Sequence, residues 1–183
     1  FLLTFLAINV IIVIIAFSSF LNTVPNPKNL SDFSAPASSQ IFDKNNTLLY
    51  NSYRKENRIP VTLSHISPFL IKATIASEDS RFYHHFGIDI IALTRSFFHN
   101  LTHKSIQGGS TITQQLAKNV FLTPEKSLKR KIEEAVLAFR IESNFSKDQI
   151  LELYFNAVSY GGDTVGIEAA SQRYFGKKSQ ELS

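Results

Sequence analysis

The chain has 183 residues, of which 44% are hydrophobic and 19% are charged. This composition predicts a folded protein of about one domain and excludes a largely disordered chain. The formal net charge of +4 does not by itself indicate nucleic-acid binding, so we expect no nucleic-acid partner. Cysteine is absent, which excludes disulfides, a thiolate nucleophile and cysteine-ligated metals. Because methionine is missing even at position 1 and the chain stops at Ser183 without a terminating feature, we expect a fragment of a longer protein.

An uncharged apolar run opens the chain at residues 1–21, FLLTFLAINVIIVIIAFSSFL. A helix of this length, at 1.5 Å per residue, spans the hydrocarbon core of a bilayer. We expect an uncleaved transmembrane anchor and not a signal peptide, because no clear small-residue cleavage site follows the run. Residues 22–40 are rich in Pro, Asn and Ser, and this composition predicts a linker.

The remaining sequence predicts a short β-hairpin followed by helices, and so a mainly α fold. Two apolar runs flank Asn45-Asn46, which indicates a hairpin, and residues 60–63 are expected to add an extended piece. Helical spacing of apolar residues dominates after residue 67. The expected helix starts are Ser67-Pro68, Asp89, Ser110, Thr123-Pro124 and Ser146, and a last helix is expected at 167–174 after the glycines at 161, 162 and 166.

A polar helix start behind Gly108-Gly109 is the first candidate site. With Ser110 as the N-cap, free backbone N–H groups at a helix N-terminus would favour an anion, such as a phosphate. This stretch alone leaves a capped surface helix as the equal alternative.

Two adjacent carboxylates, Glu78 and Asp79, end an apolar helix and form the second candidate site. A carboxylate at a helix C-terminus meets the negative end of the helix dipole, which favours proton uptake. The alternative is that both carboxylates simply solvate a loop beside Arg81.

A charged helical face provides the third candidate site. Lys126, Arg130 and Glu134 are spaced four residues apart, so they would share one face. Such a face could hold a diphosphate with a carboxylate at its edge, because cations neutralise the charge that develops on a phosphate leaving group; the alternative is a solvated stripe. His99 and His103 are also four apart, but no acidic third ligand lies nearby, so we expect no metal site.

Five short patterns occur in order along the chain. They are Glu78-Asp79-x-x-Phe82-x-x-His85-x-Gly87-x-Asp89, Gly109-Ser110-Thr111-Ile112-x-Gln114-Gln115-x-x-Lys118-Asn119, Arg130-Lys131-x-x-Glu134, Lys147-x-x-Ile150-Leu151-Glu152-x-Tyr154-Phe155-Asn156, and Gly166-Ile167-Glu168-Ala169-Ala170-x-x-x-Tyr174-Phe175-Gly176-Lys177. Together they resemble the motifs of the peptidoglycan glycosyltransferases, glycosyltransferase family 51, which form the polymerase module of class A penicillin-binding proteins and of monofunctional transglycosylases. The chain departs from the family at Lys126, where Arg is usual, and at Phe155, where Leu is usual; Lys keeps the charge but loses the bidentate fork for phosphate.

The resemblance implies a mainly α, lysozyme-like glycosyltransferase domain with a small membrane-proximal lobe. This domain would occupy residues 41–183 and lack the last helices of the family's domain. The implied function is polymerisation of lipid II into glycan strands, with inversion at the anomeric carbon and release of undecaprenyl diphosphate. The implied location is a bacterial inner membrane, crossed once, with the domain on the periplasmic face. Other cell-wall synthesis proteins would be further partners.

The resemblance also implies roles for individual residues. Glu78 would be the general base, and Glu134 would be a second carboxylate that positions the donor or a bridging cation. The residues that would hold the diphosphate are Lys118, Lys126, Arg130 and Lys131. The residues that would bind sugar or phosphate are Ser110, Thr111, Gln114, Gln115 and Asn119. The residues that would organise the first motif are Asp79, Phe82, His85 and Gly87. No cofactor would be required, although a divalent cation, Mg²⁺ or Mn²⁺, would assist at the diphosphate without a dedicated metal cage.

Two other functions remain alternatives. The first is a lysozyme-like muramidase or lytic transglycosylase, which would have no diphosphate for the basic clamp to hold. The second is an inactive membrane-anchored cell-wall scaffold, which the presence of both Glu78 and Glu134 argues against. Residues 41–60 are more similar to bifunctional penicillin-binding proteins, but the sequence up to Ser183 does not tell whether a transpeptidase domain follows.

Overall fold

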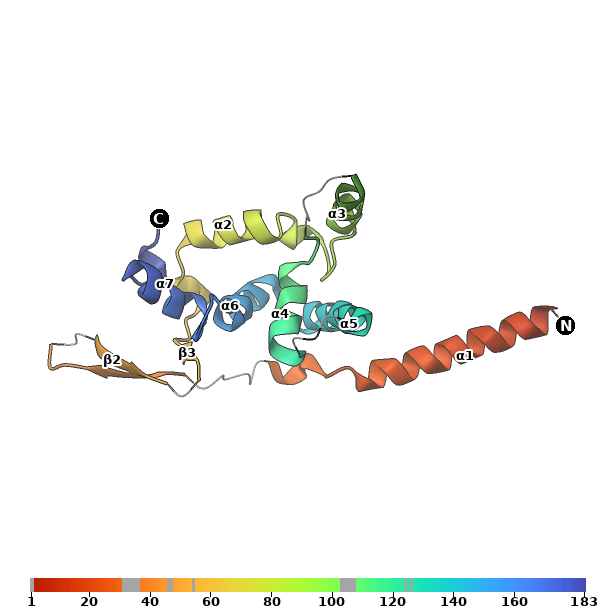
Figure 1. The fold of residues 1–183 in the computed structure, drawn as a ribbon, viewed down its shortest axis with the longest axis horizontal. Helices are drawn as coiled ribbons and strands as arrows, with labels where there is room; N and C mark the ends of the chain where they lie inside the picture. The colour runs from red at the N-terminus through yellow and green to blue at the C-terminus, as the bar shows by residue number, and fades with distance from the viewer. Residues whose placement is uncertain are drawn as a thin grey trace.

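The structure, a computed structural model, describes residues 2–30, 37–45, 48–53, 55–102, 108–123, 125 and 127–183. In these ranges the chain is mainly helical with two small sheets (Figure 1), which confirms the predicted fold class. The expectations for Asn46, His103, Pro124 and Lys126 lie outside the described residues.

The N-terminal helix α1 (Leu2–Thr23) projects from the body of the molecule (Figure 1). Its segment Thr4–Thr23 has a mean hydropathy of 2.5, and none of its most apolar window is buried against the rest of the chain. A helix of this length and composition is able to cross a membrane, as the sequence predicts.

The residues directly after α1 pack on the body. Val24 and Leu30, the latter at the end of the 3-10 helix η1 (Pro27–Leu30), are 4% and 1% exposed and belong to the hydrophobic core. The range 22–40, predicted as a linker, therefore begins with a packed segment. It ends in strand β1 (Ser39–Phe42), the first strand of the hairpin.

The predicted hairpin is present. Strand β1 pairs antiparallel with β2 (Leu48–Ser52), with Ser39 opposite Ser52. A second, parallel pair joins β3 (Asn57–Arg58) to β4 (Thr164–Val165). The predicted extended piece at 60–63 is not a strand, since residues 63–65 form the 3-10 helix η2 (Leu63–His65).

Three helices carry the core: α4 (Ile112–Phe121), α5 (Leu128–Asn144) and α6 (Lys147–Ala157). Their apolar residues recur every three or four positions, so each helix presents one apolar stripe to the others. The core residues that they supply with no exposed surface include Ile112, Leu116, Leu137, Ile141, Ile150 and Leu151. Helix α4 lies at the centre of the body, between α5 and α6 (Figure 1).

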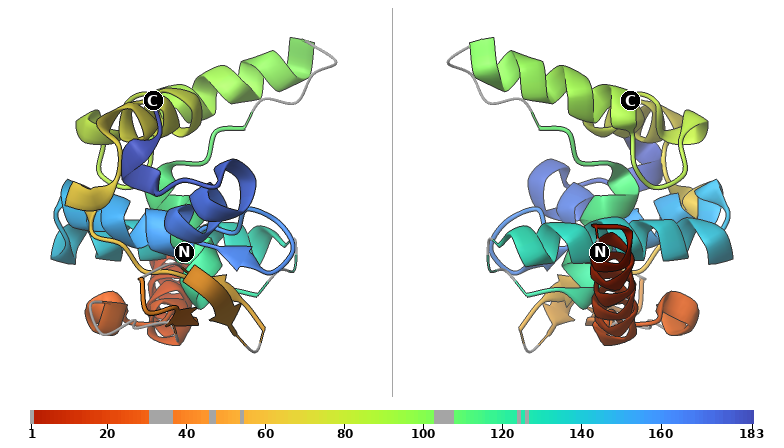
Figure 2. Two further views of the ribbon diagram at one scale, coloured as in Figure 1. Left: turned by 90° about the vertical axis from the view of Figure 1, so that its left-hand side faces the viewer. Right: turned by 90° about the vertical axis from the view of Figure 1, so that its right-hand side faces the viewer.

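The remaining helices surround this core. Helix α2 (Pro68–Glu78) begins and ends as the sequence predicts. Helix α7 (Ile167–Phe175) follows the glycine-rich turn, and the 3-10 helix η4 (Ser179–Glu181) comes after it. The short helix η3 (Phe82–His84) connects α2 to α3 (Ile90–Thr102), whose first turn is capped by the Asp89 carboxylate (Oδ1 to Ala92 N, 2.9 Å). Helix α3 lies apart from the core helices (Figures 1 and 2). The resemblance implies a small membrane-proximal lobe but does not assign residues to it.

Two predicted helix starts are wrong. The N-cap of α4 is Thr111 and not Ser110, because a capping box needs Gln or Glu three residues later, and Gln114 completes that box only with Thr111. Helix α5 begins at Leu128 and not after Thr123, because the Ser127 hydroxyl accepts the backbone N–H of Arg130 and so caps the first turn. The predicted capping box of Ser146 and Gln149 is confirmed.

Candidate active site

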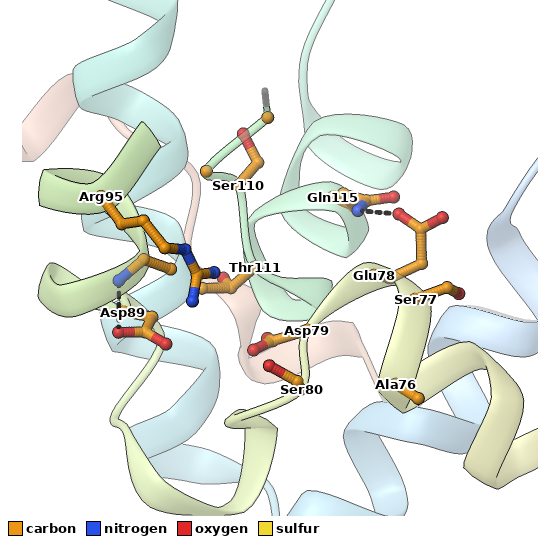
Figure 3. Close-up of a pocket in the computed structure, with 13 residues that line it drawn as sticks. Ala76, Ser77, Glu78, Asp79, Ser80, Asp89, Arg95, Ser110, Thr111 and Gln115 are labelled. Atoms are coloured by element: carbon orange, nitrogen blue, oxygen red, sulfur yellow. Dashed lines mark hydrogen bonds between the residues drawn. The ribbon is translucent and has the colours of Figure 1, made fainter. Parts of the chain in front are cut away.

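A cavity of about 440 Å³ lies between the C-terminal end of α2, the first turns of α3 and the N-terminal end of α4 (Figure 3). Five of the predicted site residues line it: Glu78, Asp79, Ser110, Thr111 and Gln115. The first two candidate sites of the sequence are thus the two sides of one cavity.

Glu78, the last residue of α2, is exposed at this cavity. Its carboxylate accepts one hydrogen bond from the side-chain amide of Gln115 (Nε2 to Oε2, 2.8 Å; Figure 3). The carbonyl of the same amide accepts from the hydroxyl of Tyr154 on α6 at 3.3 Å. Burial, and then the charge of Glu78, raises the pKa of Tyr154 to about 12, so this hydroxyl remains a donor at neutral pH.

Asp79 is next to Glu78 in sequence but lies in a different environment. It is 6% exposed, and its two carboxylate oxygens accept from His85 Nε2 at 2.9 and 3.0 Å. Oδ2 also accepts the backbone N–H of Ile112 at 3.0 Å, in the first turn of α4. Asp79 and His85 therefore fix the end of α2 to the start of α4, which agrees with the organising role that the resemblance implies.

Phe82 and Gly87 complete the frame of the first motif. Phe82 is fully buried, with the Lys147 ammonium 4.4 Å from its ring centroid. Gly87 has a φ of +83°, and a Cβ there would lie 2.9 Å from the backbone C and O of Ala138, so only glycine fits. The Gly87 carbonyl accepts from the Thr111 hydroxyl at 2.6 Å, which ties the motif to the cap of α4.

Glu134, the second predicted catalytic carboxylate, is buried within the basic start of α5. Its side chain is 3% exposed and is paired with Lys131 Nζ at 2.8 Å and with Arg130 Nε at 3.2 Å. The ammonium of Lys131 also donates to the Ser110 hydroxyl at 2.6 Å. The solvated stripe that the sequence left as an alternative is therefore wrong for Glu134, and α5 reaches the cavity through Ser110.

Some predicted site residues lie away from the cavity lining. Gln114 is 3% exposed and is engaged in the capping box of α4. The predicted catalytic and substrate-binding residues that are described and do not line the cavity are Gln114, Lys118, Asn119, Arg130, Lys131 and Glu134, while Lys126 lies outside the described residues. Their predicted contacts with substrate stay predictions.

Sequence reasoning missed two side chains at the site. Arg95 extends from α3 into the cavity (Figure 3); its signal is that it is the only Lys or Arg in this helix. Tyr154 belongs to the fourth motif, but the sequence gives no signal that its hydroxyl faces a residue of the second motif. That contact joins positions 39 residues apart.

One group of side chains has the residue types of a metal site but does not fit one. Ligand atoms of Asp79, His85 and Asp89 lie within 4.8 Å of one another. The Asp79 oxygens already accept from His85 and from Ile112 N, and Asp89 caps α3 and pairs with Arg81 (3.2 Å). A hard cation such as Mg²⁺ needs carboxylate oxygens that are free to coordinate it, so we derive no step through an ion here.

Comparison with known proteins agrees with these observations. Penicillin-binding protein 1A of Aquifex aeolicus (strain VF5) is 46% identical over 161 residues, covering 87% of this chain and 22% of that protein. Penicillin-binding protein 1A of Escherichia coli (strain K12) is 45% identical over 161 residues, covering 87% and 19%, and penicillin-binding protein 1F of Bacillus subtilis (strain 168) is 44% identical over 148 residues, covering 80% and 21%. The chain thus spans about a fifth of the length of the curated relatives it matches. The sequence profile described as Transglycosylase matches residues 44–183, and the chain belongs to this family, the peptidoglycan glycosyltransferases whose motifs it carries.

Proposed function

We propose that this chain polymerises lipid II into glycan strands, with inversion at the anomeric carbon and release of undecaprenyl diphosphate. The observation that supports this most directly is the exposed Glu78 carboxylate, which stands in a cavity at the junction of the first two motifs. A general base must be within reach of the proton that it takes. Among the six carboxylates of the five motifs, only Glu78 is exposed.

In this mechanism Glu78 takes the proton of the acceptor's 4-hydroxyl. The acceptor oxygen forms a new bond to the donor's anomeric carbon while the bond from that carbon to the diphosphate oxygen breaks. The electron pair leaves with the lipid diphosphate. A single displacement of this kind inverts the anomeric carbon.

The basic groups around the cavity would stabilise the leaving diphosphate. Lys131 is already directed to the cavity wall, because it donates to Ser110, and Arg95 supplies a cation from α3. Glu134 would hold Arg130 and Lys131 in position through its two ion pairs. Lys118 and Lys126 would complete the clamp, since neutralising the developing charge lowers the barrier.

The arrangement of α1 and α3 supports action at a membrane surface. Helix α3 runs crosswise to α1 (Figures 1 and 2), so a bilayer spanned by α1 would have α3 parallel to its surface. The exposed side chains of α3 include Phe97, Phe98 and Leu101, with exposed fractions of 61%, 60% and 67%. An apolar helix face that lies flat on the interface would meet a substrate held by its lipid tail.

We place the chain in a bacterial inner membrane with its domain on the periplasmic face, where lipid II and the growing glycan are its substrates. Other cell-wall synthesis proteins would be its partners. No cofactor is required in this proposal. A divalent cation, Mg²⁺ or Mn²⁺, would be carried by the diphosphate itself, since the described carboxylates near the cavity are engaged in other contacts.

The test is Glu78→Gln, assayed by separating the glycan products of lipid II on a gel. We expect polymer yield to fall by at least about 100-fold, the lower range for loss of a general base, with the thermal unfolding midpoint unchanged. Full polymer yield from the variant would overturn the assignment. Release of fragments from isolated sacculi, without chain growth from lipid II, would favour the muramidase alternative.

A further inference from the structure

We propose that Tyr154 is a positioning residue of this active site, which acts through the Gln115 side chain to hold Glu78 in place. The proposal rests on the proposed function, because it concerns the group that we assign as the general base. It is carried by a chain of two hydrogen bonds that joins three separate elements of the fold.

The first link joins α4 to α2. Gln115 lies one turn into α4 and donates from its amide nitrogen to Glu78 Oε2 at 2.8 Å (Figure 3). The amide is half-buried at the cavity, whereas Glu78 is exposed and its carboxylate makes no other side-chain hydrogen bond in the described part of the chain. Gln115 is therefore the group that restricts where the Glu78 carboxylate can stand.

The second link joins α4 to α6. The Tyr154 hydroxyl donates to Gln115 Oε1 at 3.3 Å, and the Tyr154 side chain is only 4% exposed. Its ring belongs to the hydrophobic core and contacts Phe155 edge to face at a centroid distance of 5.8 Å. The position of the hydroxyl is thus restricted, because the ring that carries it is packed in the hydrophobic core.

The two links together determine which way the amide faces. An amide has one acceptor end and one donor end, and it can turn by half a rotation to exchange them. If the Gln115 carbonyl faced Glu78, two negatively polarised oxygens would meet and the Tyr154 hydroxyl would lose its acceptor. The Glu78 carboxylate only accepts, so it favours the orientation in which the amide N–H₂ faces it, and the Tyr154 hydroxyl holds the other end of that amide by donating to its carbonyl.

The expected consequence falls on the chemical step and not on substrate binding. A general base works only when its oxygen lies within hydrogen-bond reach of the reacting hydroxyl. Small displacements of a catalytic group therefore lower the rate of the chemical step. Tyr154 lies behind Gln115 as seen from Glu78, so its hydroxyl is not required to touch substrate. Removing it would loosen Gln115 and Glu78 while leaving the binding surfaces unchanged.

The experiment is a double-mutant cycle on the intact chain, with lipid II polymerisation measured in detergent micelles. The variants are Tyr154→Phe, Gln115→Leu and the double variant, with Tyr160→Phe as the matched control. Tyr160 is a neighbouring half-buried tyrosine whose hydroxyl makes no hydrogen bond within the described part of the chain. Its removal tests whether any tyrosine hydroxyl near Glu78 matters.

We expect Tyr154→Phe to lower kcat about 3- to 10-fold, the range for one hydrogen bond, with KM unchanged and Tyr160→Phe equal to wild type. In the Gln115→Leu background, Tyr154→Phe should have no further effect, because it acts through the amide that is already gone. The proposal would be overturned if the losses of kcat in the two single variants multiplied in the double variant, or if Tyr154→Phe left kcat unchanged. Those results with an inactive Glu78→Gln would refute only this inference. An active Glu78→Gln would refute the assignment of Glu78 as the general base, and a wild-type chain that forms no polymer from lipid II would refute the proposed function itself.

Discussion

The two carboxylates that the motifs single out, Glu78 and Glu134, lie in opposite environments. Glu78 ends α2, is exposed in the cavity and receives one hydrogen bond from a neutral amide. Glu134 lies in the second turn of α5, is 2% exposed and is paired with two cations. One is accessible to a reacting hydroxyl, and the other is enclosed by its partners.

The difference teaches that a motif carboxylate can serve a reaction in two ways. A buried charge is tolerated only when opposite charges surround it, so Glu134 is suited to hold Lys131 and Arg130 in place. Lys131 in turn contacts Ser110 on the cavity wall at 2.6 Å. Glu134 is thus connected to the cavity through Lys131 and Ser110, whereas Glu78 lines the cavity itself.

The largest expected effect is the loss of stability in Glu134→Ala. We expect a loss of about 3 kcal/mol, the low end for breaking a buried ion pair. Lys131 and Arg130 would remain close together without a counter-charge, but their side chains are 42% and 19% exposed and so stay partly solvated. Denaturant unfolding in micelles, monitored by circular dichroism, would measure it. Glu133→Ala is the matched control, since the ion pair that Glu133 makes among the described residues is with the exposed Lys129, at 3.8 Å. Equal stability of the two variants would show that Glu134 is not held as a buried structural charge.

Asp79→Ala sharpens the comparison, because Asp79 is adjacent to Glu78 but buried like Glu134. We expect a loss of roughly 3 kcal/mol, since His85 and the Ile112 N–H would lose a charged acceptor and remain buried. Glu78→Gln, one residue away, should change stability by less than about 0.5 kcal/mol. The same unfolding assay compares the two, and a larger loss for Glu78→Gln would reverse our assignment of the exposed and structural carboxylates.

Tyr154, which is linked to Glu78 through Gln115, allows a test by the pH dependence of the unfolding free energy. Its pKa is raised from 10.0 to about 12 by burial and by the charge of Glu78, so the folded state holds this proton more tightly than the unfolded chain. The stabilisation is complete below pH 10 and is lost as the pH rises to about 12. This loss amounts to about 2–3 kcal/mol at most.

The measurement is the difference in unfolding free energy between wild type and Tyr154→Phe, followed from pH 8 to pH 12. The wild type should lose stability relative to Tyr154→Phe as the pH rises, because the variant lacks the titrating hydroxyl. A difference that stays constant over this range would show that the hydroxyl is not buried as the structure describes.

Local signals explain what could be predicted from the sequence. Helix α2 begins at Pro68 and α6 follows the box of Ser146 and Gln149, because caps and proline act within a few residues. The starts of α4 and α5 were misplaced because Ser110 and Thr123 are equally good caps by residue type. Only the partner three residues later, or the tertiary structure, decides between neighbouring candidates.

The arrangement of the site depended on contacts that a pattern of residues does not contain. Lys131 and Ser110 are 21 positions apart, and Tyr154 and Gln115 are 39 apart. A run of charged residues at the start of a helix resembles a solvated face, so the burial of Glu134 was not visible. The motif resemblance names candidate residues, whereas the structure distinguishes those that line the cavity from those that do not.

The smallest expected effect concerns Ser110, the residue that connects the two regions of this comparison. Ser110→Ala removes the hydroxyl that accepts from Lys131, and an accessible hydrogen bond of this kind contributes about 1 kcal/mol. Lys131 keeps its ion pair with Glu134 at 2.8 Å, so the fold should be little changed. If Ser110 directs the Lys131 ammonium toward the diphosphate, the variant should raise the KM for lipid II several-fold and also lower kcat, because the same ammonium would stabilise the charge that develops on the leaving diphosphate. Lys129→Ala, on an exposed side chain of the same helix, controls for a general loss of positive charge. An equal rise in KM for both variants would mean that the total charge of α5, and not the contact with Ser110, attracts the substrate.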